Sequence, residues 1–334
     1  MLRFALIGAG RIGKMHANHI ASNDKCVLEV VYDLNTKASK EIANKHNCNI
    51  AKSAKEAILN KNIDVVYITS ATSTHIKYIL LAAKSGKSIF CEKPIDLDIL
   101  KVDKCRKELK KYNVPIHIGF NRRFDLSHKS AKEAKDSGEI GNLEMIIITS
   151  RDPRPSTLSY HKYSGGIFKD MTIHDFDLAC FILGNDPIIE ISVYGGNLFS
   201  STIKKINDLD TAMIIMKSKS GVLCHINNSR HAAYGYDQRL EIFGSKGMVI
   251  SNNKSSSSIK KYNKNFTNAN YPFYDFFIER YEQAYKDQLE NFAQCLINHK
   301  PTSVNFEDGR NALIIANAAY RALSLNKSVK IKYN

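Results

Sequence analysis

A carboxylate and an imidazole lie four residues apart in the middle of the sequence, where Asp170 precedes His174 shortly after Gly165 and Gly166. One helical turn takes about 3.6 residues, so a helix through this segment would place both side chains on one face. A carboxylate beside an imidazole selects the ring's tautomer and raises its basicity, which suits a base that takes a proton from an alcohol. On its own this spacing more often marks a helix start with a surface histidine, so its meaning depends on the other motifs.

A glycine fingerprint near the start of the chain predicts a dinucleotide site. An apolar run at 4–7 leads into residues 8–13, which match the pattern G-x-G-x-x-G. Gly8 allows a tight turn, Gly10 lets the backbone approach a pyrophosphate, and Gly13 lets the following helix pack closely on the strand. These first residues are therefore expected to form a strand and a phosphate turn rather than a secretory signal.

An acidic residue follows at the distance that such a site requires. A second apolar run at 27–32 ends at Asp33, 20 residues beyond the third glycine, where a carboxylate can accept hydrogen bonds from the adenosine ribose. Asp33 would repel a 2′-phosphate, and the next residues, Leu34 and Asn35, offer no cation to bind one. The sequence therefore predicts NAD rather than NADP as cofactor, with Lys37 as the one nearby cation.

A Glu-Lys-Pro turn lies at the expected end of a later strand, at 92–94. Ligands of open α/β sheets bind outside the carboxyl ends of the strands, and proline restricts the residue before it to extended conformations. Lys93 would then point in one fixed direction, where its ammonium could bind a substrate oxygen and stabilise a developing alkoxide. The alternative is an ordinary surface lysine at a strand end.

The sequence changes texture near residue 121. Before that point short apolar runs alternate with amphipathic stretches, the pattern of βαβ units with a mostly parallel sheet. After it, strand-like runs lie close together and are joined by short turns. We therefore expect an α/β protein with a Rossmann domain (a doubly wound parallel sheet) at 1–121 and, at 122–334, a substrate-binding and oligomerisation α/β domain with a large, open, mostly antiparallel sheet.

The expected elements follow from these runs. Strands are expected at 64–68, 88–92, 116–120, 143–149, 188–194, 211–216, 221–227, 239–243, 248–251 and 329–331. Helices are expected near 36–46, 53–59, 74–85, 98–112, 126–136 and 310–325. Apolar residues at helical spacing predict one more long helix through 277–296, and the polar stretch 252–270 is expected to be a mobile loop or a loose hairpin.

Composition favours a soluble, cytoplasmic protein without a metal. The 334 residues, 43% of them hydrophobic, can fill two cores, and no apolar run approaches the roughly 18 residues of a membrane span. The 48 basic and 33 acidic side chains are spread along the chain, so we expect neither nucleic acid nor a membrane as partner. The seven cysteines lack a C-x-x-C pair and are expected to be reduced thiols. His16 and His19 have no acid or cysteine at ligand spacing.

Together these motifs resemble one known family. Residues 8–13, 91–94, 119–125 and 165–175 match, in order and spacing, the glucose-fructose oxidoreductase and inositol dehydrogenase family. The segments 150–153, 170–177 and 234–239 look most like its inositol 2-dehydrogenase branch. The resemblance implies a Rossmann domain followed by an α/β domain whose open sheet assembles subunits, commonly into tetramers.

The resemblance also implies functional residues. The implied catalytic triad is Lys93, Asp170 and His174. The predicted cofactor contacts are Gly8, Gly10, Arg11, Ile12, Gly13, Asp33, Thr72, His75, Glu92 and Lys93. The predicted substrate contacts are Lys93, Arg123, Asp152, Asp170, His174 and Tyr236. His161 and the 252–270 insert have no confident counterpart.

The implied reaction is oxidation of a ring secondary alcohol of a small polyol, with hydride transfer to NAD. His174 would take the hydroxyl proton, Asp170 would orient the imidazole, and Lys93 would bind the same oxygen. The branch points to myo-inositol, oxidised at its axial hydroxyl to the 2-keto product. Two alternatives stay open: a family enzyme for another inositol isomer, an aldose or an amino-sugar nucleotide, and a non-catalytic sensor of NAD or sugar. A sensor has no need of lysine, aspartate and histidine together.

Overall fold

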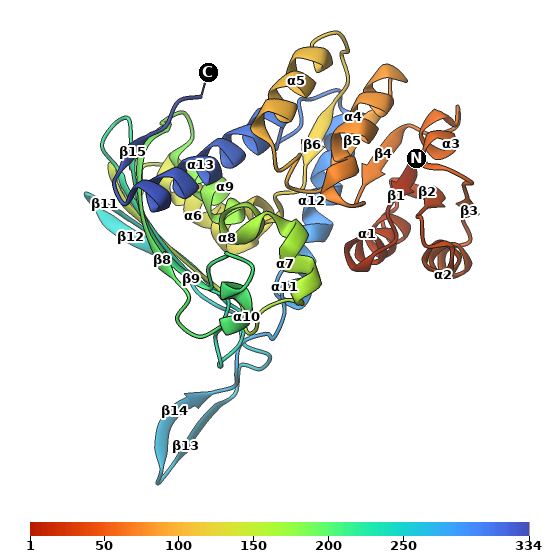
Figure 1. Cartoon of the computed structure of the whole chain (residues 1–334). Helices are drawn as coiled ribbons and strands as arrows, with labels where there is room; N and C mark the ends of the chain where they lie inside the picture. The colour runs from red at the N-terminus through yellow and green to blue at the C-terminus, as the bar shows by residue number, and fades with distance from the viewer. Residues whose placement is uncertain (334) are drawn as a thin grey trace. The chain divides into compact units, whose positions relative to one another are not determined.

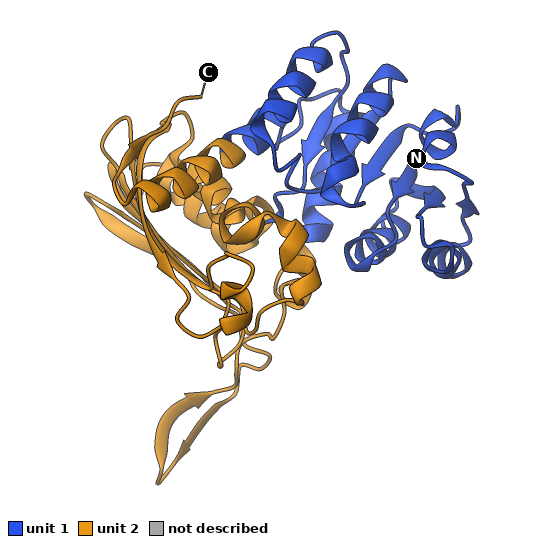
Figure 2. Ribbon diagram, in the orientation of Figure 1, with its two compact units in different colours: residues 1–121, 285–311 blue, residues 122–284, 312–334 orange. Residues whose placement is uncertain are grey.

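The computed structural model describes residues 1–333 and divides into two compact units (Figure 2). Unit 1 comprises Met1–Asn121 and Tyr285–Asn311, and unit 2 comprises Arg122–Ala284 with the described residues from Ala312 onward. The sequence had assigned all of 122–334 to the second domain. Residues 285–311 instead belong to unit 1, because one of their helices buries its apolar side chains in the unit 1 core.

Unit 1 is built, within residues 1–333, on a six-stranded sheet in which all pairings are parallel (Figure 1). The strands are β1 (Leu2–Ile7), β2 (Cys26–Tyr32), β3 (Asn49–Ile50), β4 (Val65–Ile68), β5 (Ser88–Cys91) and β6 (Ile116–Ile118). Their order, β3-β2-β1-β4-β5-β6, is that of doubly wound dinucleotide-binding domains, which confirms the predicted Rossmann fold. The sequence missed β3, since two exposed residues give no periodic signal.

Three helices of unit 1 begin where a short polar side chain caps them. The elements are α1 (Arg11–Ala21), α2 (Thr36–His46), α3 (Ala54–Leu59), the short 3₁₀ helix η1 (Thr72–Thr74), α4 (His75–Lys84) and α5 (Ile99–Leu109). Asn35 accepts hydrogen bonds from the first backbone N–H groups of α2, and Ser53 and Asp98 do the same for α3 and α5. The helix α12 (Glu282–Ile297) returns to this unit and places Leu289, Phe292 and Ala293 in its core.

Unit 2 contains a seven-stranded sheet, within residues 1–333, in the order β12-β11-β7-β10-β9-β8-β15. Its strands are β7 (Leu143–Arg151), β8 (Ile188–Gly196), β9 (Thr211–Ser218), β10 (Leu223–Ser229), β11 (Asp237–Gly244), β12 (Gly247–Ser251) and β15 (Val329–Lys330). The pair β7 and β10 is parallel and the other pairs are antiparallel, so the predicted mostly antiparallel sheet is confirmed.

Helices cover one face of this sheet. The helices are η2 (Asn121–Phe124), α6 (Leu126–Asp136), α7 (Leu158–Ser164), α8 (Gly166–Asp170), α9 (Ile173–Leu183), α10 (Ser201–Lys204), α11 (Phe277–Arg280) and α13 (Phe306–Leu325), with η2 and α13 crossing the unit boundary. Side chains of α6, α9 and α13 share one apolar core with the sheet. The helix predicted through 277–296 divides into α11 and α12, and α7 forms in a stretch that was not predicted to be helical.

The other face of the sheet stays open. Along β9 the exposed Met213 and Ile215 alternate with the buried Ile214 and Met216, since successive side chains of a strand point to opposite faces. Exposed apolar residues also come from four neighbouring strands, namely Met145, Tyr194, Leu223, Met248 and Ile250. The sheet therefore presents an apolar surface that the chain itself does not cover.

The polar insert forms a hairpin. Strands β13 (Lys260–Asn263) and β14 (Phe266–Asn270) pair antiparallel and project from unit 2 as a narrow arm (Figure 1). The sequence left a loop and a loose hairpin open, and the structure selects the hairpin. Its predicted mobility stays a prediction.

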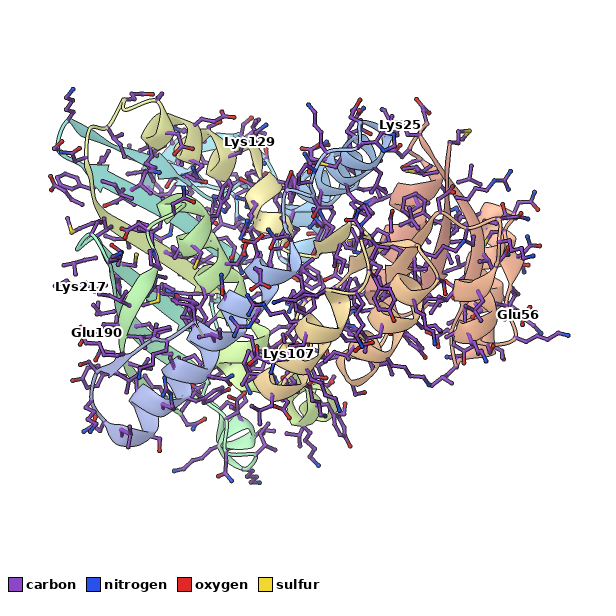
Figure 3. The ribbon with its side chains drawn as sticks, turned by 90° about the horizontal axis from the view of Figure 1, so that it is seen from above. Lys25, Glu56, Lys107, Lys129, Glu190 and Lys217 are labelled. Atoms are coloured by element: carbon purple, nitrogen blue, oxygen red, sulfur yellow. The ribbon has the colours of Figure 1, made fainter. Side chains whose placement is uncertain are left out.

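Charged side chains lie along the outside of both units (Figure 3). The lysines labelled there come from unit 1 (Lys25, Lys107) and from unit 2 (Lys129, Lys217), so the positive charge is distributed over different elements. Among the described residues no helix is long and apolar enough to cross a membrane.

Candidate active site

The fingerprint turn of unit 1 has the shape that a pyrophosphate needs. Gly8 has a φ of +112°, which L side chains rarely adopt, and a Cβ on Gly13 would lie 2.1 Å from the carbonyl oxygen of Gly8. A Cβ on Gly10 would meet no atom within 4 Å, so the space beside it is open. Gly10 caps α1, whose first N–H groups point toward this space. The residues present therefore fit a dinucleotide phosphate.

Asp33 follows β2 and closes the other side of the turn. Its Oδ2 accepts a hydrogen bond from Ala9 N at 2.6 Å, and its Oδ1 accepts one from Asn35 N at 2.7 Å. A carboxylate offers about four lone-pair positions, so each oxygen keeps capacity for one further donor. Two vicinal ribose hydroxyls would match that capacity, and the pairing of Asp33 with the adenosine ribose stays a prediction. Leu34 and Lys37 are exposed beside it.

The Glu-Lys-Pro turn follows β5, and its Lys93–Pro94 peptide bond is cis. Lys93 is half-buried, and its backbone N–H lies 3.3 Å from Glu92 Oε2. His75, predicted to contact the cofactor, is buried with Nδ1 2.8 Å from the carbonyl oxygen of Pro94 and Nε2 3.0 Å from that of Ser70. Burial lowers the pKa of His75, outweighing the two carbonyls. His75 and Thr72, at the start of η1, remain predicted cofactor contacts.

Asp170 and His174 lie on two helices instead of one. Asp170 is the last residue of α8, and His174 lies in the first turn of α9. The helix breaks at Met171 and Thr172, where the Thr172 side chain donates its hydroxyl proton to Asn228 Oδ1 at 2.6 Å. The expectation of one helix through both residues is therefore wrong. The triad itself, with Lys93 in unit 1, stays a prediction.

Asp170 is held by two partners that the sequence analysis did not identify. Tyr160 donates its hydroxyl proton to Asp170 Oδ1 at 2.6 Å, and Arg230 Nη1 lies 3.3 Å from Asp170 Oδ2. Arg230 is 1% exposed, and its Nη2 lies 3.5 Å from Asp208 Oδ2. Asp208 in turn accepts the backbone N–H of Ile167 at 2.9 Å. A buried guanidinium is therefore shared between two carboxylates, one of them in the predicted triad.

Asp152 lies just after β7 in the same electrostatic environment. Burial raises its pKa to about 6, with Asp170 adding to the increase and Arg230 opposing it. Tyr236, just before β11, is buried, and burial raises its pKa well above the usual value. Unit 2 thus combines a carboxyl group that titrates near neutrality with a phenol that stays protonated. Both types can pair with the hydroxyls of a polyol.

Two more arginines carry buried carboxylate partners. Arg123 forms a double hydrogen bond to Asp177, with Nε–Oδ2 at 2.9 Å and Nη2–Oδ1 at 2.6 Å. Arg122 pairs with Asp175, and both side chains are buried. Burial raises the pKa of Asp175 despite Arg122, while Asp175 raises that of Arg122 against the effect of burial. Arg123 was a predicted substrate contact, and both aspartates stand in the quoted 170–177 run, but their role as arginine partners was missed.

His161, left without a role, lies in α7 and is buried, and its ring is 6.1 Å from that of Tyr160. Burial lowers its pKa, and Arg230 acts in the same direction. Among the described residues no group of three or more His, Cys, Asp or Glu side chains is arranged to hold a metal ion.

Comparison with known families identifies the class. The sequence model of the oxidoreductase family with an NAD-binding Rossmann fold matches residues 2–120. That of the GFO/IDH/MocA C-terminal domain matches residues 128–250. The chain therefore belongs to the GFO/IDH/MocA oxidoreductase family, and NAD is confirmed as the predicted cofactor type.

The chain is also similar to individual proteins along its whole length. It is 40% identical over 332 residues to myo-inositol 2-dehydrogenase of Thermotoga maritima, covering 99% of each sequence. The crystal structure of a myo-inositol dehydrogenase from Corynebacterium glutamicum superposes with a TM-score of 0.96 at 42% identity, covering 99% of both chains. A scyllo-inositol dehydrogenase from Lactobacillus casei, solved with NAD(H) and scyllo-inositol, gives a TM-score of 0.92 at 27% identity, covering 99% of each chain.

Proposed function

We propose that this protein is an NAD-dependent inositol 2-dehydrogenase that oxidises myo-inositol at its axial hydroxyl to the 2-keto product. The observation that carries this proposal is the similarity, at 40% and 42% identity over the whole chain, to two proteins named for myo-inositol. Two scyllo-inositol dehydrogenases are less similar, at 31% and 27% identity. The phosphate turn, Asp33 and the predicted site residues of unit 2 are of the types that this reaction needs.

The residues divide the work of the reaction. When bound, NAD supplies the hydride acceptor. His174 takes the proton of the reacting hydroxyl, and Asp170 holds the imidazole in the orientation to do so. Lys93 binds the same oxygen and stabilises its developing negative charge. Asp33 selects NAD by pairing with the ribose hydroxyls.

The remaining hydroxyls of the polyol fix the ring. Arg123, Asp152 and Tyr236 are proposed to bind them, because an unpaired buried polar group costs about 1 to 3 kcal/mol. An axial hydroxyl leaves its C–H bond equatorial, so hydride transfer requires one orientation of the ring. An isomer that lacks the axial group leaves site groups unpaired, and sites built on such pairing reject analogues by large factors.

We further propose a homotetramer in the cytoplasm. The open face of the unit 2 sheet exposes Met213, Ile215 and Leu223, and contiguous apolar surface of this kind is typical of contact between protein chains. All seven cysteines, which lie within residues 1–333, are free thiols, as is typical of the cytoplasm. Light scattering should give four times the chain mass of 37.6 kDa.

Initial rates of NADH formation test the proposed activity. The enzyme is assayed with NAD at mildly alkaline pH against myo-inositol, scyllo-inositol, D-chiro-inositol and glucose. Myo-inositol should give the highest kcat/KM, and scyllo-inositol, with no axial hydroxyl, a much lower one. A best rate with another member of this panel would move the proposal to that substrate within the family. The absence of NADH with every polyol would favour the sensor.

A further inference from the structure

The side chain of His16 is fully buried in α1, and both of its ring nitrogens have partners. Nε2 lies 2.8 Å from Glu92 Oε1, and Nδ1 lies 2.8 Å from the hydroxyl oxygen of Tyr67. A neutral imidazole has one N–H and one lone pair, and an ionised carboxylate only accepts hydrogen bonds. With a neutral ring and an ionised Glu92, the N–H lies on Nε2 and Tyr67 donates to Nδ1. The chain of donors runs in one direction, from Tyr67 through His16 to Glu92.

Glu92 connects this chain to the turn that carries Lys93. Its Oε2 lies 3.3 Å from the backbone N of Lys93, while its Oε1 is the atom that faces His16. On the side of β6, a Cβ added to Gly119 would lie 2.7 Å from Glu92 Oε2, so the carboxylate packs on a backbone without a side chain. The orientation of Glu92 is therefore fixed from α1, β6 and the turn itself.

His75 contacts the far side of the same turn. It is buried at the start of α4, and its Nδ1 lies 2.8 Å from the carbonyl oxygen of Pro94. Lys93 thus lies between one residue oriented by His16 and another contacted by His75.

Burying the hydrogen-bonded side chains of Tyr67, His16 and Glu92 costs stability that apolar side chains at the same positions would not cost. The surroundings are aromatic: Tyr67 stacks on Phe90 with ring centroids 4.0 Å apart, and the His16 ring lies 5.7 Å from that of Phe90. Burying polar groups is unfavourable unless every one is paired, but a fully paired buried network holds its members in one arrangement. The arrangement that this network holds is the direction of the Glu-Lys-Pro turn.

We infer that His16 is a positioning residue for the reaction, which orients Lys93 through Glu92, with Tyr67 as the group that fixes the tautomer of His16. The inference rests on the proposed function, since it takes Lys93 as the catalytic group that is positioned. A displacement of about 1 Å at a catalytic group can cost about 100-fold in rate. Loss of the His16 contact should therefore lower kcat and leave the adenosine half of the cofactor site unaffected.

The test compares His16→Leu with a matched buried histidine. His117 in β6 is also fully buried and also lies against Phe90, with ring centroids 5.0 Å apart, but its Nε2 lies 3.1 Å from Gln288 Nε2. His16→Leu should lower kcat with myo-inositol about tenfold and leave the NADH dissociation constant, measured by fluorescence titration, within threefold. His117→Leu should leave kcat within twofold. His16→Gln keeps a hydrogen-bond donor, and Tyr67→Phe removes only a hydroxyl. Both variants should therefore lower kcat less than His16→Leu does.

A double mutant shows whether the effect passes through Lys93. In a Lys93→Ala background, single-turnover NADH formation should be nearly the same with and without His16→Leu, because residues that act through one another are not additive. The inference would be overturned if His16→Leu lowered the rate by the same factor in the native and the Lys93→Ala enzymes. It would also be overturned if His117→Leu lowered kcat as much as His16→Leu does. Either result would leave the catalytic role of Lys93 intact. Near wild-type turnover of Lys93→Ala itself would overturn both. If His16→Leu does not fold, His16→Gln and Tyr67→Phe decide by the same comparison.

Discussion

The two units hold their candidate site residues in different ways. In unit 1 most of the groups are set by backbone shape and by contacts that end on backbone atoms, such as Asp33 with the N–H of Ala9 and His75 beside the carbonyl of Pro94. Glu92 is the exception, since its carboxylate also contacts the buried His16. In unit 2 they are set by buried ion pairs, such as Arg230 with Asp170 and Arg123 with Asp177. The proposed cofactor half is thus specified mainly by local turns, and the proposed polyol half by balanced charge.

This difference affects what each half tolerates. A turn accepts many side chains as long as its glycines remain, whereas a buried ion pair fails when either partner is removed, because the remaining charge is left unpaired. Substitutions in unit 2 should therefore act first on stability. Substitutions in unit 1 should act first on turnover and cofactor choice.

The largest expected effect is on the shared cation of unit 2. Arg230→Met removes the buried cation that pairs with both Asp170 and Asp208, and removal of one member of a buried pair typically costs about 3–5 kcal/mol. The urea midpoint of unfolding should fall accordingly, and the midpoint of Arg230→Lys should fall less than that of Arg230→Met. The control is Arg154→Met, which breaks the exposed pair with Asp275 and should leave the midpoint nearly unchanged. Equal midpoints for Arg230→Met and Arg154→Met would remove the distinction between the units.

The next effect is on chemistry. Lys93→Ala and His174→Ala should each lower kcat by roughly 100-fold, the usual scale for an acid-base group, while NADH binding stays nearly intact. Asp170→Asn should act through His174, so its effect should not add to that of His174→Ala. Stopped-flow absorbance of NADH measures the step, and the exposed Lys101→Ala in α5 is the control. Near wild-type turnover of Lys93→Ala would contradict the assignment.

The same contrast explains how much the sequence could predict. The fingerprint, Asp33 and the Glu-Lys-Pro turn were found because their spacing along the chain determines their geometry. The ion pairs of unit 2 were not, since Arg122 and Asp175 are 53 residues apart and Arg230 and Asp170 are 60 apart.

The break between α8 and α9 was missed for the same reason. Thr172, at the break, contacts Asn228, and the two residues are 56 apart in the sequence. Asn228 is placed by its register opposite Ser150 in the neighbouring strand, and no local pattern encodes that pairing. The two arrays of strands, by contrast, follow from apolar runs and turn residues that can be read locally.

The preference for NAD over NADP tests the proposed role of Asp33 in unit 1. Asp33→Ser should narrow the ratio of kcat/KM for NAD over NADP by about tenfold, or about 1.4 kcal/mol, by removing the charge that repels a 2′-phosphate. Asp33→Asn separates charge from shape, because its carbonyl oxygen can still accept the N–H of Ala9, 2.6 Å from the carboxylate in the native chain. Both variants should shift the ratio in the same direction. An equal or better kcat/KM with NADP in the native enzyme would contradict the role of Asp33.

The smallest expected effect is on the pH dependence of stability in unit 2, through Asp152. Its pKa is raised from 3.8 to about 6, mainly by burial. Below pH 3.8 the Asp152 carboxyl is protonated in both the folded and the unfolded chain. Its favourable contribution to the free energy of unfolding is then fully present. As the pH rises toward and through 6, the unfolded chain ionises first and this stability is lost.

Asp152→Asn removes that loss, so the variant should gain stability relative to the native chain between pH 4.5 and pH 8. The full shift corresponds to about 1.36 kcal/mol per pKa unit, but Asp152 is partly exposed, so we expect a relative gain of about 1 kcal/mol. Thermal melting of both proteins at the two pH values measures it. The difference in Tm between variant and native chain should be larger at pH 8. A difference that is constant with pH, or larger at pH 4.5, would mean that Asp152 is ionised in the fold at both values and that burial does not control it.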